Sequence, residues 1–146
     1  MANLDFTPDE LLEQARGNQT AFWHLTLRWA RDHERSVDSW ATFVGEQFAP
    51  SWDGLGDDAS AHRVAELAAF NIATTADMRP VAVTGDDSRA ELVIAGPDDE
   101  TLRSWGTLRD DSDRANEIIF PQIAERRGLT LEAKRETDDL HLVFAR

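Results

Sequence analysis

The chain has few residue types that can carry out chemistry, and its clearest pattern is a histidine one helical turn before a glutamate, His62 and Glu66. Residues four apart share a face of a helix, so the carboxylate can orient the imidazole. Such a pair can act as an oriented general base, or its side chains can ligate a metal. The same spacing also suits a surface pair worth roughly 0.2–0.5 kcal/mol. We predict that both residues are catalytic and that they bind no metal.

Four further residues are candidate ligand contacts. Asn71 falls in line with apolar residues of the same helix, so we expect it to face inward, bonded to backbone or presented to a ligand. Trp52 lies in a loop rich in proline and glycine, where it could cover the mouth of a pocket. His24 falls on an arginine-bearing helix face that we expect to be solvated. His33 lies at the end of the same helix, where it could instead cap the C-terminus.

That long helix also carries an apolar stripe. Phe22, Leu25 and Trp29 recur at helical spacing, and the stripe ends at His33. Large apolar residues on one face of a helix usually pack into the core, so we expect the stripe to be buried, on the side of the helix away from His24.

Several kinds of chemistry are excluded by what the sequence lacks. It has no cysteine, which excludes disulfides, thiolate nucleophiles and cysteine-type zinc sites. It has no phosphate-binding glycine loop, dinucleotide fingerprint or nucleophile elbow, so neither nucleotide binding nor serine-hydrolase chemistry is expected. The paired aspartates fall at expected turns and lack the spacing of a calcium loop. We therefore expect no cofactor.

The charge balance limits the partners. Among 146 residues, 28 are Asp or Glu and 15 are Lys or Arg, which gives a net charge of −13. Affinity for nucleic acid and for anionic membranes comes from Lys and Arg, so we expect neither partner. A small-molecule ligand, a basic protein partner or a second copy of the chain all stay open. The sequence shows no signal peptide and no segment of transmembrane length, which predicts a cytoplasmic protein.

Periodicity predicts helices first and strands later. A capping box from Thr7 to Glu10 begins a helix that Gly17 either breaks or weakens, and helical patterns follow at about 20–34, 37–49, 59–75 and 112–127. Pro121 predicts a kink or two abutting helices. A short helix is expected around Leu102, a loop at 50–58, and β-hairpins at 80–94 and 129–146. The expected fold is a single α+β domain over 1–146, with N-terminal helices packed on a four-stranded antiparallel sheet made of two hairpins.

Residues 79–146 follow a familiar order: a hairpin, a helix that ends in glycine, and a last hairpin that finishes in the apolar strand 140–144. This layout resembles the C-terminal half of vinyl-reductase-type domains, and it is similar to small aminothiazoline-carboxylate hydrolase-like proteins. The resemblance implies a small-molecule pocket between sheet and helices. Those families often carry cysteines near the strands and this chain has none, so no functional residue is carried over.

Two functions from different classes fit the sequence. The first is a small-molecule-binding domain, with a cofactor-independent hydrolase or proton-transfer activity in a helix-lined pocket. The alternative is a non-catalytic acidic interaction protein, such as an inhibitor, an immunity-type partner or an accessory subunit. The first requires polar candidates to converge on one cavity, whereas the second predicts a filled core and a contiguous acidic patch.

Overall fold

The computed structural model describes residues 7–33, 35–56, 58–75 and 77–146. The helical part comes first, with α1 (Pro8–Asp32), α2 (Val37–Phe48), the 3-10 helix η1 (Ala49–Leu55) and α3 (Ala61–Ile72). There follow the hairpin of β1 (Arg79–Gly85) and β2 (Arg89–Ala95), the helices α4 (Asp99–Trp105) and α5 (Arg109–Glu125), and the hairpin of β3 (Thr130–Glu136) and β4 (Asp139–Ala145). The predicted α+β class and both hairpins are confirmed.

Three local expectations are corrected or decided. The predicted loop at 50–58 begins inside η1, because α2 tightens into 3-10 geometry before it ends. Helix α1 is continuous through Gly17, so this residue does not break it. Pro121 lies inside the single helix α5.

The two hairpins form one antiparallel sheet in the order β1-β2-β4-β3. They meet along β2 and β4, where Leu92 lies opposite Leu142 and Ala90 opposite Phe144. Alternate side chains of a strand point to the same face, so these four residues face one side of the sheet. All four are at most 1% exposed. The apolar face of the sheet must therefore be fully covered by helices.

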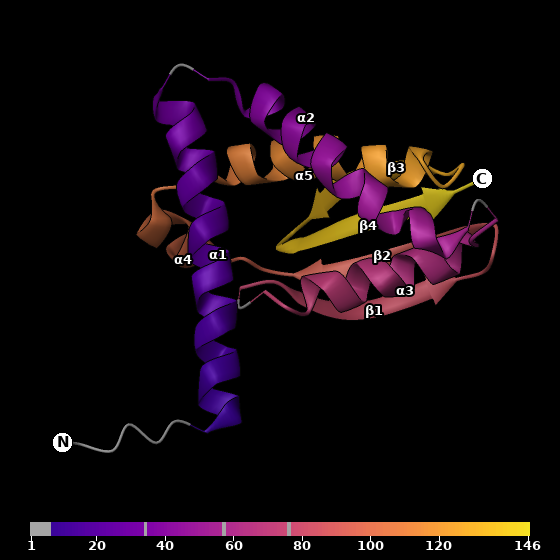
Figure 1. Ribbon diagram of the computed structural model, residues 1–146, viewed down its shortest axis with the longest axis horizontal. Helices are drawn as coiled ribbons and strands as arrows, with labels where there is room; N and C mark the ends of the chain where they lie inside the picture. Colours follow the sequence, from indigo (N-terminus) through magenta and orange to yellow (C-terminus); the bar gives the residue numbers. More distant parts are fainter. Residues whose placement is uncertain (1–6, 34, 57, 76) are drawn as a thin grey trace.

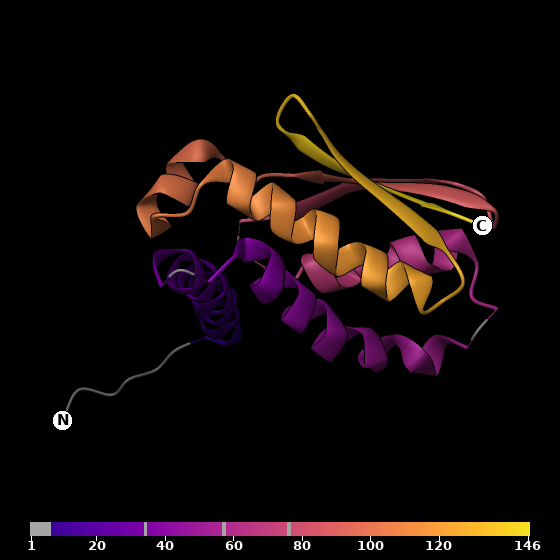
Figure 2. The same cartoon turned by 90° about the horizontal axis from the view of Figure 1, so that it is seen from above.

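Helices α3 and α5 provide this cover, side by side on one face of the sheet, and α2 lies against α5 on the side away from the sheet (Figures 1 and 2). Helix α1 crosses one end of this assembly, and its N-terminal part extends past the edge strand β1 (Figure 1). Gly45 permits the close approach of α2 to α5, because a Cβ atom there would collide with the side chain of Gln122. The molecule therefore has a sheet layer and a layer formed by α3 and α5, and the other helices lie around these two layers.

Two apolar clusters fill the space between these layers. The first joins α3 and the sheet through Val64, Leu92, Leu142 and Phe144. The second joins α2, η1 and α5, and its buried members are Ala41, Ala49, Ala115, Ile119 and Ile123.

The C-terminal strand should contribute strongly to stability, because Phe144 is 1% exposed in the first cluster. We expect Phe144→Ala to lower the free energy of unfolding by about 3–5 kcal/mol, measured by urea denaturation. Phe43 is 61% exposed, so the matched change Phe43→Ala should cost less than about 1 kcal/mol. Equal urea midpoints for the two variants would contradict the placement of Phe144 in the core.

Ion pairs connect α5 to the helical elements beside it. Arg114 Nη2 lies 2.7 Å from Asp38 Oδ2 on α2, and Arg126 Nε lies 2.6 Å from Asp53 Oδ1 on η1. Hydrogen bonds from these arginines lower the pKa of both aspartates below the usual value. Both carboxylates are therefore charged at neutral pH and hold α2 and η1 to α5.

Acid should weaken these links. Folding lowers the pKa of Asp53, so its stabilising contribution is complete above the unfolded-state pKa of about 3.9 and is lost as the pH falls through the lower folded-state value. Asp53→Asn should lower stability at neutral pH and flatten the decline at acid pH. Urea midpoints between about pH 6 and pH 2 test this. Glu46→Gln, on the exposed surface of α2, is the control and should leave the decline unchanged.

Candidate functional site

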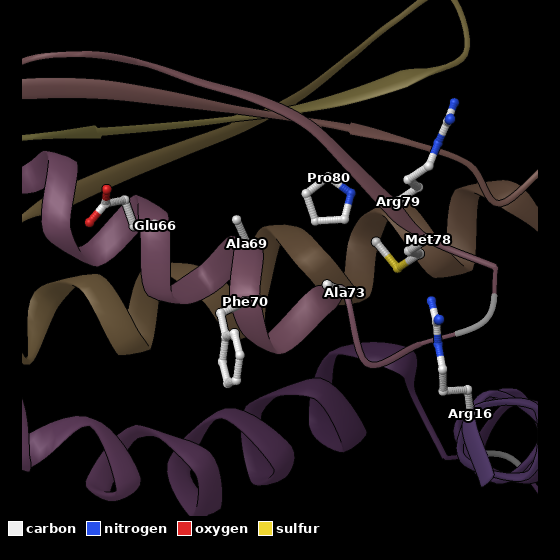
Figure 3. Close-up of a pocket in the computed structure, with 8 residues that line it drawn as sticks. All are labelled: Arg16, Glu66, Ala69, Phe70, Ala73, Met78, Arg79 and Pro80. Carbon is white, nitrogen blue, oxygen red and sulfur yellow. The ribbon is translucent and has the colours of Figure 1, made fainter. Parts of the chain in front are cut away.

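A groove of about 430 Å³ opens between the C-terminal half of α3, the beginning of β1 and the middle of α1 (Figure 3). The residues that line it are Arg16, Glu66, Ala69, Phe70, Ala73, Met78, Arg79 and Pro80. They come from three parts of the chain that are brought together only by the packing of α1 and α3 beside the edge strand β1.

The wall of the groove is apolar. Ala69 and Ala73 lie one turn apart on α3, and their small side chains leave room beside the helix. Phe70 stands next to them and is 72% exposed, while Met78 and Pro80 form the opposite wall at the start of β1 (Figure 3). A largely exposed aromatic ring beside an apolar hollow offers a surface on which a flat or aliphatic ligand can pack.

Two arginines lie at the end of the groove away from Glu66 (Figure 3). The Nε and Nη2 atoms of Arg16 donate hydrogen bonds to the Thr75 carbonyl at 3.3 and 2.9 Å, which hold its guanidinium in place. Arg79 stands at the rim and is exposed. Within the described part of the chain, neither arginine forms an ion pair, whereas Arg63 and Arg114 each contact a carboxylate. This end of the groove therefore carries positive charge that no carboxylate of the described residues neutralises in a direct ion pair.

His62 and Glu66 share one side of α3, as their spacing predicts. The Nε2 atom of His62 lies 3.7 Å from Oε1 of Glu66, which is too long for a hydrogen bond. Glu66 instead accepts a hydrogen bond from Arg63 Nη1 at 3.1 Å. The two side chains are 36% and 47% exposed, so neither is interior. Glu66 forms one end of the groove, but His62 is not among the lining residues.

His24 does not lie on a solvated face, so this expectation is wrong. It is 2% exposed, and its Nε2 lies 2.8 Å from Asp77 Oδ2. Thr20 lies one turn away on α1 and donates to Asp77 Oδ1 at 3.1 Å. The buried face of α1 comprises Thr20, His24, Leu27 and Ala30. These polar bonds attach α1 to the body together with the fully buried Leu27, and Trp23 packs edge-on against Trp40 of α2.

The apolar stripe of α1 is exposed, contrary to expectation. Phe22 is 71% exposed, Leu25 is 48% exposed and Trp29 is 53% exposed. The stripe lies on the opposite side of the helix from the face that the His24–Asp77 pair holds against the body. The periodicity identified the stripe correctly, but the prediction that it is buried was wrong. Amphipathic spacing identifies the apolar face of a helix and does not indicate what covers that face.

The remaining candidates lie apart from the groove. Asn71 is exposed and donates to the Leu67 carbonyl at 3.0 Å, so the inward orientation is wrong and the backbone-bonded alternative holds. His33 is the C-cap of α1, with its Nδ1 2.9 Å from the Trp29 carbonyl and its ring stacked on Trp29. Trp52 packs against both apolar clusters instead of covering a pocket mouth. A role for any of them in ligand binding stays a prediction.

Sequence analysis pointed to Glu66 and the small residues beside it on α3, but it missed Arg16, Met78, Arg79 and Pro80, which complete the groove. Arg16 and Arg79 are 63 positions apart in the chain, and no local pattern connects them. Phe70 and Met78 resemble ordinary apolar residues until their exposure and position are known. Asp77 falls in an irregular connection, where an aspartate normally signals only a turn. One signal was available. The link from α3 to β1 is short, so the beginning of β1 must lie close to the end of α3.

No protein-family model matches this chain, and no curated protein matches it. The resemblance to vinyl-reductase-type and aminothiazoline-carboxylate hydrolase-like domains therefore stays a prediction. In the described residues, no helix is long and apolar enough to cross a membrane. The same residues contain no group of three or more potential metal ligands. Function must be inferred from the geometry of the groove.

The contact of His24 with Asp77 should be a structural anchor for α1. Removal of either partner leaves a polar group buried without its bond, so His24→Ala and Asp77→Ala should each lower the free energy of unfolding by about 1–3 kcal/mol. The double variant should cost less than the two single changes together, because the interaction is already lost after the first. Strictly additive urea results would show that the two residues stabilise the protein independently.

Proposed function

We propose that this protein binds a small molecule that combines a carboxylate with an apolar body, in the groove between α1, α3 and β1. One observation carries the proposal: in a chain of net charge −13, two arginines without an ion-pair partner in the described residues border an apolar groove. Eight other arginines of the described chain form ion pairs with Asp or Glu. Arg16 and Arg79 form none there, and both border the apolar groove.

The arginines support a carboxylate as the anionic group. A guanidinium has five N–H donors in a planar fork that matches a carboxylate. Arg16 is half-buried and directs its Nε and Nη2 at the Thr75 carbonyl, which leaves Nη1 and part of Nη2 to donate elsewhere. A carboxylate bound there would make charge-assisted hydrogen bonds, each worth about 1.5–3 kcal/mol. Arg79 at the rim would add a longer-range attraction.

The apolar wall supports the second part of the ligand. Phe70 and Met78 both line the groove, and Ala69 and Ala73 of α3 lie beside them (Figure 3). Burial of apolar surface contributes about 25 cal/mol per Å², so covering an exposed phenyl ring would add to affinity. Glu66 at the other end would disfavour a second negative charge on the ligand.

A hydrolase or proton-transfer activity is the finer form of this proposal. In that form Glu66 contacts the ligand. His62 acts only as a positioning residue for Glu66, with its Nε2 3.7 Å from Oε1 of that carboxylate. Ligand binding does not require the hydrolase or proton-transfer activity. His62→Ala should therefore leave ligand affinity within about twofold of the wild type, since the expected change is below 0.5 kcal/mol for an exposed site.

The binding proposal is tested with three probes that share one carbon skeleton: 4-phenylbutyrate, 4-phenylbutan-1-ol and 4-phenylbutylamine. We expect the carboxylate to bind about tenfold or more tightly than the alcohol, and the amine to bind most weakly. Isothermal titration calorimetry and NMR shift mapping give the affinities and the location. Resonances of Phe70, Ala73 and Met78 should move.

Two charge-removing variants and a control make the test specific. Arg16→Gln should weaken phenylbutyrate binding by about tenfold or more. Arg79→Gln should weaken it by about twofold to fivefold, because its charge acts from the exposed rim. Both should leave binding of the alcohol unaffected. Arg103→Gln, an exposed arginine on α4 outside the groove, should change neither. Equal affinity of all three probes, or shifts that map elsewhere, would overturn the proposal. That result would favour the acidic interaction protein instead.

A further inference from the structure

The exposed stripe of α1 has the spacing of a coiled-coil seam. Its members recur at alternating steps of four and three residues, which is the a/d pattern of a heptad, and they are Leu11, Ala15, Asn18, Phe22, Leu25 and Trp29. Every one of them is exposed. The seam extends over about 27 Å of helix, because each residue advances about 1.5 Å. A surface helix that needed only to pack on its own body would not repeat this pattern on its outer side.

The body of the protein cannot cover this seam. The face of α1 that contacts the body carries His24 and Leu27, about half a turn around the helix from Phe22. The N-terminal part of α1 also extends past β1, and its Leu11 is 55% exposed (Figure 1). Short helical segments without packing are marginal in water. The described part of the chain therefore leaves the seam uncovered along its whole length.

We propose that the partner is a second copy of this chain, whose α1 packs antiparallel against the seam. A two-fold axis at the level of residue 20 places Leu11 against Trp29 of the second copy, Ala15 against Leu25, and Asn18 against Phe22. Each pair brings a smaller side chain against a larger one, so the layers have similar volume. A parallel pair would instead put Trp29 against Trp29 and Ala15 against Ala15, which alternates crowded layers with empty ones.

Charge along α1 favours the same arrangement. The first two turns carry Asp9, Glu10 and Glu13, whereas the last two carry Arg28, Arg31 and Asp32, and Asp32 pairs with both arginines. Antiparallel packing keeps the acidic ends of the two helices apart, and it also opposes the two helix dipoles. A parallel pair would bring like charges together. An anionic membrane fits less well, because the net charge of the chain is −13.

A closed two-fold pair also explains why the helix extends past the sheet. The N-terminal half of each α1 would cover Phe22, Leu25 and Trp29 of the other copy, and the same surface patch would serve on both chains. Phe22 and Trp29 alone expose more than half of rings that bury about 150–250 Å² each when covered. This inference does not rest on the proposed ligand.

The first experiment measures the mass of the full chain by light scattering after size exclusion, over a range of concentrations. We expect about twice the chain mass of 16.4 kDa at micromolar concentration. Phe22→Gln should raise the dissociation constant of the dimer by about tenfold or more, because the substitution occurs twice in each dimer. Phe70→Gln is the matched control, since Phe70 is 72% exposed and lies on α3, and it should leave the mass unchanged.

The second experiment reads the orientation and uses the absence of cysteine in the chain. Ala15→Cys protein mixed with Leu25→Cys protein should form a disulfide-linked dimer, while each variant alone should not. Cross-linking of one variant with itself would indicate a parallel pair and overturn the proposal. A wild-type monomer at all concentrations, or a dimer that survives Phe22→Gln, would overturn it too. Co-sedimentation of a monomer with anionic phosphatidylglycerol vesicles, abolished by Phe22→Gln, would assign the seam to a membrane instead.

Discussion

The structure depends on one constraint: the inner face of β2 and β4 must be removed from water. Leu92, Leu140, Leu142 and Phe144 are all at most 1% exposed, and a sheet of this size cannot bury such a face by itself. Helices α3 and α5 cover it, and the remaining helices are positioned on these two. Helix α2 and η1 attach to α5 through the second apolar cluster and through Asp38 and Asp53. The groove exists because α3 ends beside the edge strand β1, where no further helix continues the layer.

Strand and helix boundaries could be predicted because their determinants are local. Thr7, Ser36, Ser60 and Asp98 each accept a hydrogen bond from the first turn of the helix that follows, and these are the residue types that sequence analysis uses to begin helices. The change to alternating apolar residues after Pro80 likewise located the first hairpin. The order of the strands was not predicted: the structure pairs β2 with β4, which buries the apolar faces of both hairpins together.

The environment of α1 could not be predicted in the same way. Its apolar side has the stronger pattern, yet the side that meets the body is the one with His24 and Thr20. The reason lies 53 residues away, where Asp77 supplies an acceptor for both side chains. Gly96 has a φ of 85°, and a Cβ atom there would collide with the Asp77 carbonyl, so a third segment also helps to position this connection. Distant polar contacts of this kind leave no periodic trace in the sequence.

The polar contacts between α1 and the connection from α3 to β1 also give the two sides of α1 a different chemistry. On one side, Arg16, Thr20 and His24 form directional bonds to the connection between α3 and β1, and these bonds specify where the helix lies. Leu27 adds a fully buried apolar contact on this side, whereas Phe22, Leu25 and Trp29 are left on the outer side. Arg16 also borders the groove, which makes α1 the element that both completes the candidate ligand site and carries the exposed seam. A partner that packs on the exposed seam and fixes the position of α1 would therefore also fix the Arg16 guanidinium at the groove.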